Sequence, residues 1–160
     1  MPRLLLSIVA AVALAAPTFA ADITRQSVID GMNRYRAEHN LPALHEDARL
    51  DAAAEDRIHD MEDLGYWAHE SPDGRAPFVW FKPNGYDFHF AGENLATGFE
   101  TCEVLVDAWM ESPGHRANIL SADYDDCGVA LIDGSTTGRA AGKSIVVLFG
   151  RPMPALKHHD

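Results

Sequence analysis

Hydrophobic residues recur at helical spacing in two long segments near the start of the chain. The first segment runs from a cap at Asp22 or Thr24 to about Asn40, and the second runs from a cap at Asp47 to Leu64. Gly65 suits the left-handed position that follows a helix. The predicted buried faces consist of Val28, Ile29, Met32 and Tyr35 in the first helix and of Leu50, Ala54, Ile58, Met61 and Leu64 in the second.

The rest of the chain predicts shorter elements and ends in a β-rich region. Two runs rich in β-formers, separated by a loop of Gly, Ser and Thr, predict a hairpin. Because helices come first and the hairpin last, we expect an α+β fold with helices packed on a small antiparallel sheet. The predicted elements are a turn at 71–74, a short helix at 77–82, a brief strand or loop at 91–96, a helix at 102–110 and hairpin strands at 128–132 and 144–149.

The first residues have the pattern of a secretory signal peptide. Arg3 precedes the apolar run Leu4 to Ala16, and Thr18-Phe19-Ala20 places small residues where a signal peptidase cuts. The alternative is an uncleaved membrane anchor, although the run is short for a bilayer. We therefore expect a signal peptide at 1–20, one domain at 22–150 and a flexible tail at 151–160. The mature chain would have no membrane span and would be periplasmic or extracellular.

The charge balance narrows the possible partners. Asp and Glu number 24 against 13 Lys and Arg, for a formal net charge of −11. A nucleic-acid partner needs a basic face, and an anionic membrane surface attracts basic segments. We expect neither partner, and we expect the domain to be a monomer.

The chain contains two cysteines, Cys102 and Cys127. In an exported protein an even count predicts a disulfide, which would stabilise a fold of this kind by roughly 3 kcal/mol in the chain-entropy model. The alternative is a pair of buried free thiols. The chain has no Cys-x-x-Cys, so a redox or zinc–thiolate site is not expected.

Candidate chemistry gathers at the ends of predicted elements. Glu111 and His115 stand four residues apart, and the Pro-Gly pair between them breaks any continuous helix. His69 and Glu93 lie upstream in similar loop contexts. Element ends let polar side chains reach a cleft, so the sequence predicts a polar site assembled from distant segments.

Four segments resemble the CAP superfamily of cysteine-rich secretory proteins, antigen 5 and plant pathogenesis-related proteins. They occur in that family's order and are YRAEHNLP at 35–42, AHESPDGR at 68–75, GENLA at 92–96 and SPGHRANIL at 112–120. The resemblance implies an α-β-α sandwich with a small central antiparallel sheet. It also implies a cleft of two histidines and two glutamates that holds a divalent ion. Carried over, the histidines are His69 and His115 and the first glutamate is Glu93. Ser112 stands where the family has its second glutamate, with Glu111 one residue earlier.

Three functions remain open from the sequence. The first is a binding module in which His69 and His115 hold a divalent metal, with zinc as the first candidate, beside a groove for a small apolar ligand, a peptide or an envelope component. The second is a metal-dependent hydrolase of peptide or cell-wall material with Glu93, and less clearly Glu111, as catalytic acids or bases. The third is a structural or host-interaction protein whose cleft only braces the fold. No pattern calls for an organic cofactor, and His-Glu-x-x-His and Gly-x-Ser-x-Gly are both absent.

Overall fold

A computed structural model describes residues 22–138 and 141–154. The predicted signal peptide and residues 155–160 of the predicted tail lie outside this range, whereas Arg151 and Pro152 belong to the last strand. Within the described residues, no helix is both long and apolar enough to span a membrane. The elements are α1 (Arg25–Glu38), β1 (His45–Glu46), α2 (Ala48–Leu64), β2 (Phe88–Phe99), α3 (Cys102–Glu111), α4 (Pro113–Ile119), β3 (Asp126–Asp133) and β4 (Lys143–Pro152).

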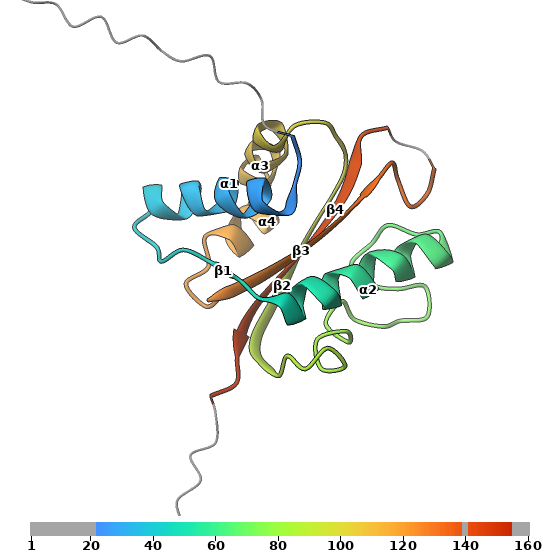
Figure 1. Cartoon of the computed structure of the whole chain (residues 1–160), viewed down its shortest axis with the longest axis horizontal. Coiled ribbons are helices and arrows are strands. Elements are labelled where there is room, and N and C mark those ends of the chain that lie inside the picture. The colour runs from blue at the N-terminus through green and yellow to red at the C-terminus, as the bar shows by residue number, and fades with distance from the viewer. Residues whose placement is uncertain (1–21, 139–140, 155–160) are drawn as a thin grey trace, which may run out of the picture.

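A four-stranded sheet forms the middle layer, with strand order β1-β3-β4-β2. The predicted hairpin is confirmed as β3 and β4, which pair antiparallel, as do β4 and β2. The sheet is nevertheless mixed, because the two-residue β1 runs parallel to β3. In Figure 1, α2 lies on one side of the sheet and α1, α3 and α4 lie on the other. The predicted α-β-α sandwich is therefore confirmed.

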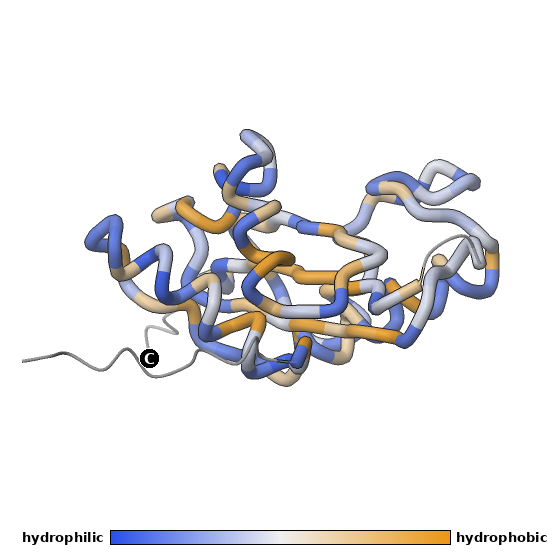
Figure 2. The backbone as a smooth tube through the Cα atoms, turned by 90° about the horizontal axis from the view of Figure 1, so that it is seen from above, coloured by the Kyte–Doolittle hydropathy of each residue, from blue (hydrophilic) through white to orange (hydrophobic). Residues whose placement is uncertain are grey.

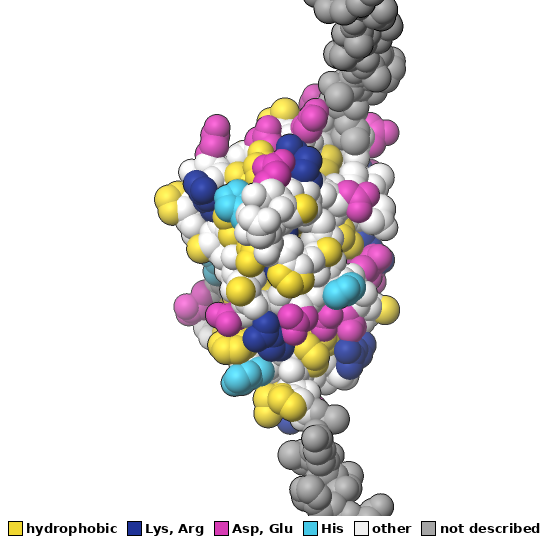
Figure 3. All heavy atoms as spheres, turned by 90° about the vertical axis from the view of Figure 1, so that its left-hand side faces the viewer, with side chains coloured by type: hydrophobic (Ala, Val, Ile, Leu, Met, Phe, Trp, Pro, Cys, Tyr) yellow, Lys and Arg dark blue, Asp and Glu magenta, His cyan; other side chains and the backbone are white. Residues whose placement is uncertain are grey.

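Alternating side chains of the sheet build two separate cores. Ile145, Val147 and Phe149 of β4 join the core beneath α1, α3 and α4, whereas Val146 and Leu148 join the core beneath α2. This follows from the period of two in a strand, which sends successive side chains to opposite faces. Figure 2 shows the hydrophobic stretches of the backbone gathered along these central strands. In Figure 3, charged side chains of both signs are interspersed over one outer face.

Capping residues set the ends of the two long helices where the sequence predicts them. Thr24 accepts a hydrogen bond from the Ser27 backbone, and the Ser27 side chain accepts one from the Thr24 backbone, forming a capping box. Asp47 caps α2, and Gly65 ends it in the left-handed conformation with φ of 66°. One predicted core position is wrong: Leu64 is 50% exposed, since it falls in the last turn, beyond the sheet-facing stripe.

Two further predictions are corrected by the structure. Residues 77–82 form turns instead of a helix, and Phe81 in their midst is fully buried in the core under α2. Six residues are too few for a stable helix, so tertiary packing of the aromatic side chains decides the conformation. The predicted brief strand at 91–96 extends to twelve residues in β2, which pairs along almost its whole length with β4.

The predicted disulfide is absent, and both cysteines are buried free thiols. Cys102 lies near Gly31 and Ser27, in the first half of α1. Cys127 lies in β3 opposite Glu46 of β1. The two thiols thus lie on different elements, one at the start of α3 and one in the sheet, and a disulfide forms only where packing brings the Cα atoms within about 7 Å. Burial raises the pKa of the Cys127 thiol to about 12, which makes it unreactive.

Candidate functional site

His69 and Glu93 meet as the sequence predicts. Nδ1 of His69 lies 2.7 Å from Oε1 of Glu93. His69 belongs to the loop that follows α2, and its side chain is 59% exposed, whereas the Glu93 side chain in the middle of β2 is 1% exposed. A carboxylate oxygen can only accept, so Nδ1 carries the proton and Nε2 of the neutral imidazole keeps its lone pair.

Arg57 of α2 occupies the second oxygen of Glu93. Its Nε donates to Oε2 over 2.8 Å, and its side chain is fully buried. The same guanidinium donates to the carbonyl oxygens of Ala68 (2.6 Å) and His69 (3.0 Å) and to the Tyr66 hydroxyl. A buried charge needs this degree of pairing to avoid a large desolvation cost. Both carboxylate oxygens of Glu93 are therefore engaged.

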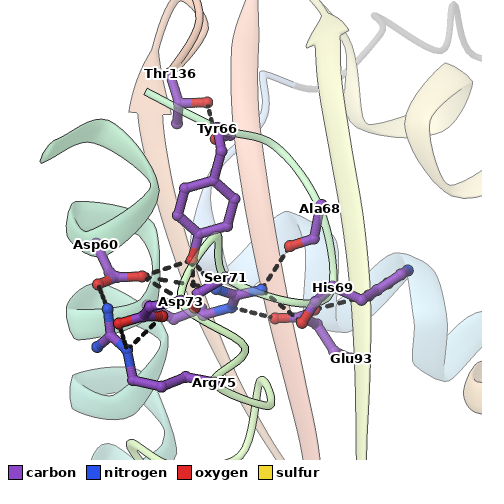
Figure 4. A network of polar contacts seen from close by, with 10 residues as sticks. Asp60, Tyr66, Ala68, His69, Ser71, Asp73, Arg75, Glu93 and Thr136 are labelled. Atoms are coloured by element: carbon purple, nitrogen blue, oxygen red, sulfur yellow. Dashed lines mark hydrogen bonds and ion pairs between the residues drawn. The ribbon is translucent and has the colours of Figure 1, made fainter. Parts of the chain in front are cut away.

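Further polar contacts hold the loop that follows α2 (Figure 4). Asp60 accepts from the Tyr66 hydroxyl (2.5 Å) and from Nη2 of Arg75 (2.6 Å). The Tyr66 hydroxyl also lies 2.9 Å from Oγ of the buried Ser71, and the Tyr66 carbonyl accepts from the Thr136 hydroxyl. Tyr66 and Arg75, which lie on either side of His69 in the loop, are thus both bound to Asp60 of α2.

His115 reaches the site from the first turns of α4. Pro113 opens this helix at a position where a missing N–H is harmless. Asn118 donates to the Glu93 carbonyl (3.0 Å) and to Oδ1 of Asn94 (2.9 Å), and Nδ2 of Asn94 donates to the His115 carbonyl (3.2 Å). Because Asn94 and Glu93 are neighbours in β2, these amides place α4 directly beside Glu93.

The two histidines respond to their surroundings in opposite directions. The hydrogen bond to Glu93 raises the pKa of His69 above its usual value. Burial, and then the charge of His69, lower the pKa of His115. At neutral pH His115 is therefore a neutral imidazole, the form that binds metals. The hydrogen bonds of Asn94 and Asn118 bring α4, which carries His115, beside Glu93, the partner of His69.

Glu111 does not join this group. It is exposed at the end of α3 and lines a groove of about 420 Å³ over α3 and α4. The other residues that line this groove are Met110, Pro113, Arg116, Ala117 and Leu120. Neither His69, Glu93 nor His115 borders it, so the structure brings together three of the four predicted site residues.

The donor chemistry fits a divalent ion only through the two imidazoles. In the described part of the chain, no three His, Cys, Asp or Glu side chains are placed to hold one ion together. Glu93 is already committed to Arg57 and His69, so it serves as an orienting partner of His69 instead of a ligand. An ion bound here would have two protein nitrogens and open positions for water or an organic ligand.

Arg57 was not predicted as a site residue, although its spacing carries a signal. It stands four residues after Ala53 and four before Met61, both of which are fully buried on the sheet-facing side of α2. A charged residue at such a position is almost never buried without a partner. That pattern indicates a buried charge pair, but the sequence does not identify Glu93 as its partner.

Comparison with known proteins identifies the class to which this domain belongs. The family model for CAP, the cysteine-rich secretory protein family, matches residues 29–149. The chain therefore belongs to the CAP family, as its motifs indicate.

Three bacterial proteins illustrate the similarity. The uncharacterized protein YkwD of Bacillus subtilis is 37% identical over 108 residues, which are 68% of this chain and 42% of YkwD. A Bacillus anthracis extracellular protein containing an SCP domain has a TM-score of 0.67 at 29% identity, covering 79% of this chain and 40% of that one. An outer surface protein of Borrelia burgdorferi shares the fold, with a TM-score of 0.70 at 22% identity over 84% of this chain and 100% of its own. The chain thus spans under half the length of YkwD.

Proposed function

We propose that this protein is an exported CAP-domain protein whose His69 and His115 bind a divalent metal ion, with zinc as the first candidate. The observation that carries the proposal is the contact between Nδ1 of His69 and Glu93, which leaves Nε2 of His69 free beside a neutral His115. A histidine that donates its second nitrogen to a carboxylate is the common arrangement around protein-bound zinc.

Export is supported by the signal-like pattern at 1–20 and by the neighbours, one described as extracellular and another as an outer surface protein. We therefore expect a monomer in the periplasm or the medium.

Hydrolysis is the weaker hypothesis. A general base must lie within hydrogen-bond reach of the proton that it removes. Both oxygens of Glu93 are bonded, one to Arg57 and one to His69, and Glu111 lies over a different groove. The geometry therefore favours a binding site over a catalytic one. When bound, the ion would polarise a ligand oxygen or a water molecule, and the role of the protein would be to orient the two imidazoles.

The aromatic side chains between Trp67 and Phe88 also favour core packing over a ligand groove. Phe81 and Tyr86 are fully buried, and Trp67, Trp80 and Phe88 pack half-buried against the same core. Binding of a small apolar ligand or a peptide beside the histidines remains a prediction.

Isothermal titration calorimetry with zinc tests the proposal. Every variant would carry His158→Gln and His159→Gln, because imidazoles near the chain end bind zinc adventitiously. Saturable one-to-one binding is expected in the parent and should be lost in His69→Ala and in His115→Ala. The matched control is His59→Ala, since His59 is exposed on α2 and its ring lies beside Glu62. Absence of binding in the folded parent would contradict the proposal and leave the bracing role.

A further inference from the structure

Arg57 links three parts of the fold that are distant in sequence. From its position in α2, the guanidinium contacts the loop after α2 and also β2, where Glu93 lies 36 residues away. The rings of Tyr66 and Trp80 flank it, with centroids 5.5 and 5.0 Å from the guanidinium carbon. The planar group can therefore neither rotate nor shift without losing several contacts at once.

Arg57 positions both the backbone and the ring of His69. The His69 carbonyl accepts from Nη2 of Arg57, and the His69 ring donates to the carboxylate that Nε of Arg57 holds. The two donors to Glu93 use different oxygens. Nε of Arg57 donates to Oε2 and Nδ1 of His69 donates to Oε1, so Arg57 holds the carboxylate in the orientation that meets His69.

We propose that Arg57 is a positioning residue of the His69–His115 site, which fixes His69 as the Nδ1–H tautomer and so reserves Nε2 for a ligand. This inference rests on the proposed metal site for its purpose, but the tautomer is a property of the metal-free protein. The two ideas can therefore fail separately.

Arg75 provides a matched control for Arg57. It belongs to the same group of contacts, donates to Asp60 and Asp73, and also stacks on Trp80. It has no contact with Glu93 or with His69. Arg57→Lys and Arg75→Lys therefore make the same chemical change at two places. Only Arg57 belongs to the chain of contacts that we propose sets the tautomer.

Long-range nitrogen–proton NMR spectra of the histidine rings, recorded at a pH where both imidazoles are neutral, report the tautomer directly. The parent and Arg75→Lys should show His69 as the Nδ1–H form. Arg57→Lys should show a mixture of tautomers, and its zinc affinity should fall about 10–100-fold, the usual cost of losing an outer partner of a metal ligand. Circular dichroism checks that each variant is folded.

Glu93→Gln tests the inference with Arg57 left in place. The amide has one oxygen, and Arg57 can only donate, so that oxygen turns to Arg57 and the NH₂ group faces His69. Nδ1 must then accept, and His69 should change to the Nε2–H tautomer and lose zinc binding. This test remains available if Arg57→Lys fails to fold.

The outcomes separate cleanly. If His69 keeps the Nδ1–H tautomer in folded Arg57→Lys, Glu93 sets the tautomer without Arg57 and the inference is wrong. If Arg57→Lys does not fold, an unchanged tautomer in Glu93→Gln overturns the inference instead. If the tautomer changes as expected but the parent binds no zinc, the inference stands and the proposed function fails.

Discussion

His69 and His115 are the same residue type in one site, yet the protein holds them by different means. His69 sits on a loop and is fixed through its ring by Glu93 and through its carbonyl by Arg57. His115 sits on a helix, and among the described residues its placement depends on backbone contacts, through Asn94 and Asn118. His69 is held by the buried ion pair of Arg57 and Glu93, whose charges must be fully paired to be stable in the interior. His115 is held by the neutral amides of Asn94 and Asn118.

The largest expected effect on stability is at Arg57, which is paired with Glu93. Arg57→Ala leaves the Glu93 carboxylate buried without its cation, so the free energy of unfolding should fall by about 3–5 kcal/mol. Arg75→Ala removes a guanidinium that is 39% exposed and should cost much less, because exposed ion pairs contribute little to stability. Urea unfolding of the two variants measures the difference. Equal losses would show that the loop, not the buried pair, bears the stability.

A substitution at Asn118, which joins α4 to β2, should lower the stability less. Asn118→Ala removes the hydrogen bonds to the Glu93 carbonyl and to Asn94, and should cost about 1–3 kcal/mol because the partners stay buried. It should also move the His115 ring resonances, since α4 loses its link to β2. Arg116→Ala on the same helix is the control, as Arg116 is exposed. An unmoved His115 in Asn118→Ala would contradict this account of how α4 is held.

The pH response should separate the two histidines. In the metal-free protein, His69 should titrate above and His115 below the usual value of 6.5. Stability from the raised pKa of His69 is complete below 6.5 and is lost as pH rises through its folded pKa. Stability from the lowered pKa of His115 is present above 6.5 and is lost as pH falls through its folded pKa.

NMR titration of both rings checks these signs. In Glu93→Gln, His69 should titrate lower than in the parent, because the amide no longer stabilises the imidazolium. A shared midpoint for both rings in the parent would contradict the assignment.

The smallest effect is expected at Glu111. Glu111→Gln should leave zinc affinity and both histidine titrations unchanged, because Glu111 borders the separate groove over α3 and α4. Calorimetry beside His115→Ala measures this. Weaker zinc binding in Glu111→Gln would mean that α3 turns its last residue into the site after all.

Local signals in the sequence predict the parts of the fold that local chemistry controls. The cap residues Thr24, Asp47 and Gly65 mark the ends of α1 and α2 correctly, since capping depends on neighbours along the chain. The helix predicted at 77–82 is wrong, because burial of Phe81 in the core, and not local preference, sets the conformation of this segment. The missing disulfide is a similar case, since the distance between Cys102 and Cys127 is set by tertiary packing.

The candidate site divides in the same way. The motifs identify His69, Glu93 and His115 and bring them into one place, but they give no account of what holds Glu93. Its partner Arg57 lies within a plain amphipathic helix, and only the three-dimensional register of α2 against β2 joins the two. The sequence therefore predicts the candidate ligands better than it predicts the residue that orients them.

The most direct test of the account is a crystal structure of the protein grown with zinc, with anomalous scattering measured at the zinc edge. We expect one ion in the site, bound by Nε2 of His69 and by a ring nitrogen of His115, with Glu93 still paired to Arg57. An ion bound directly by Glu93 or Glu111, or an empty site between the histidines at saturating zinc, would contradict it.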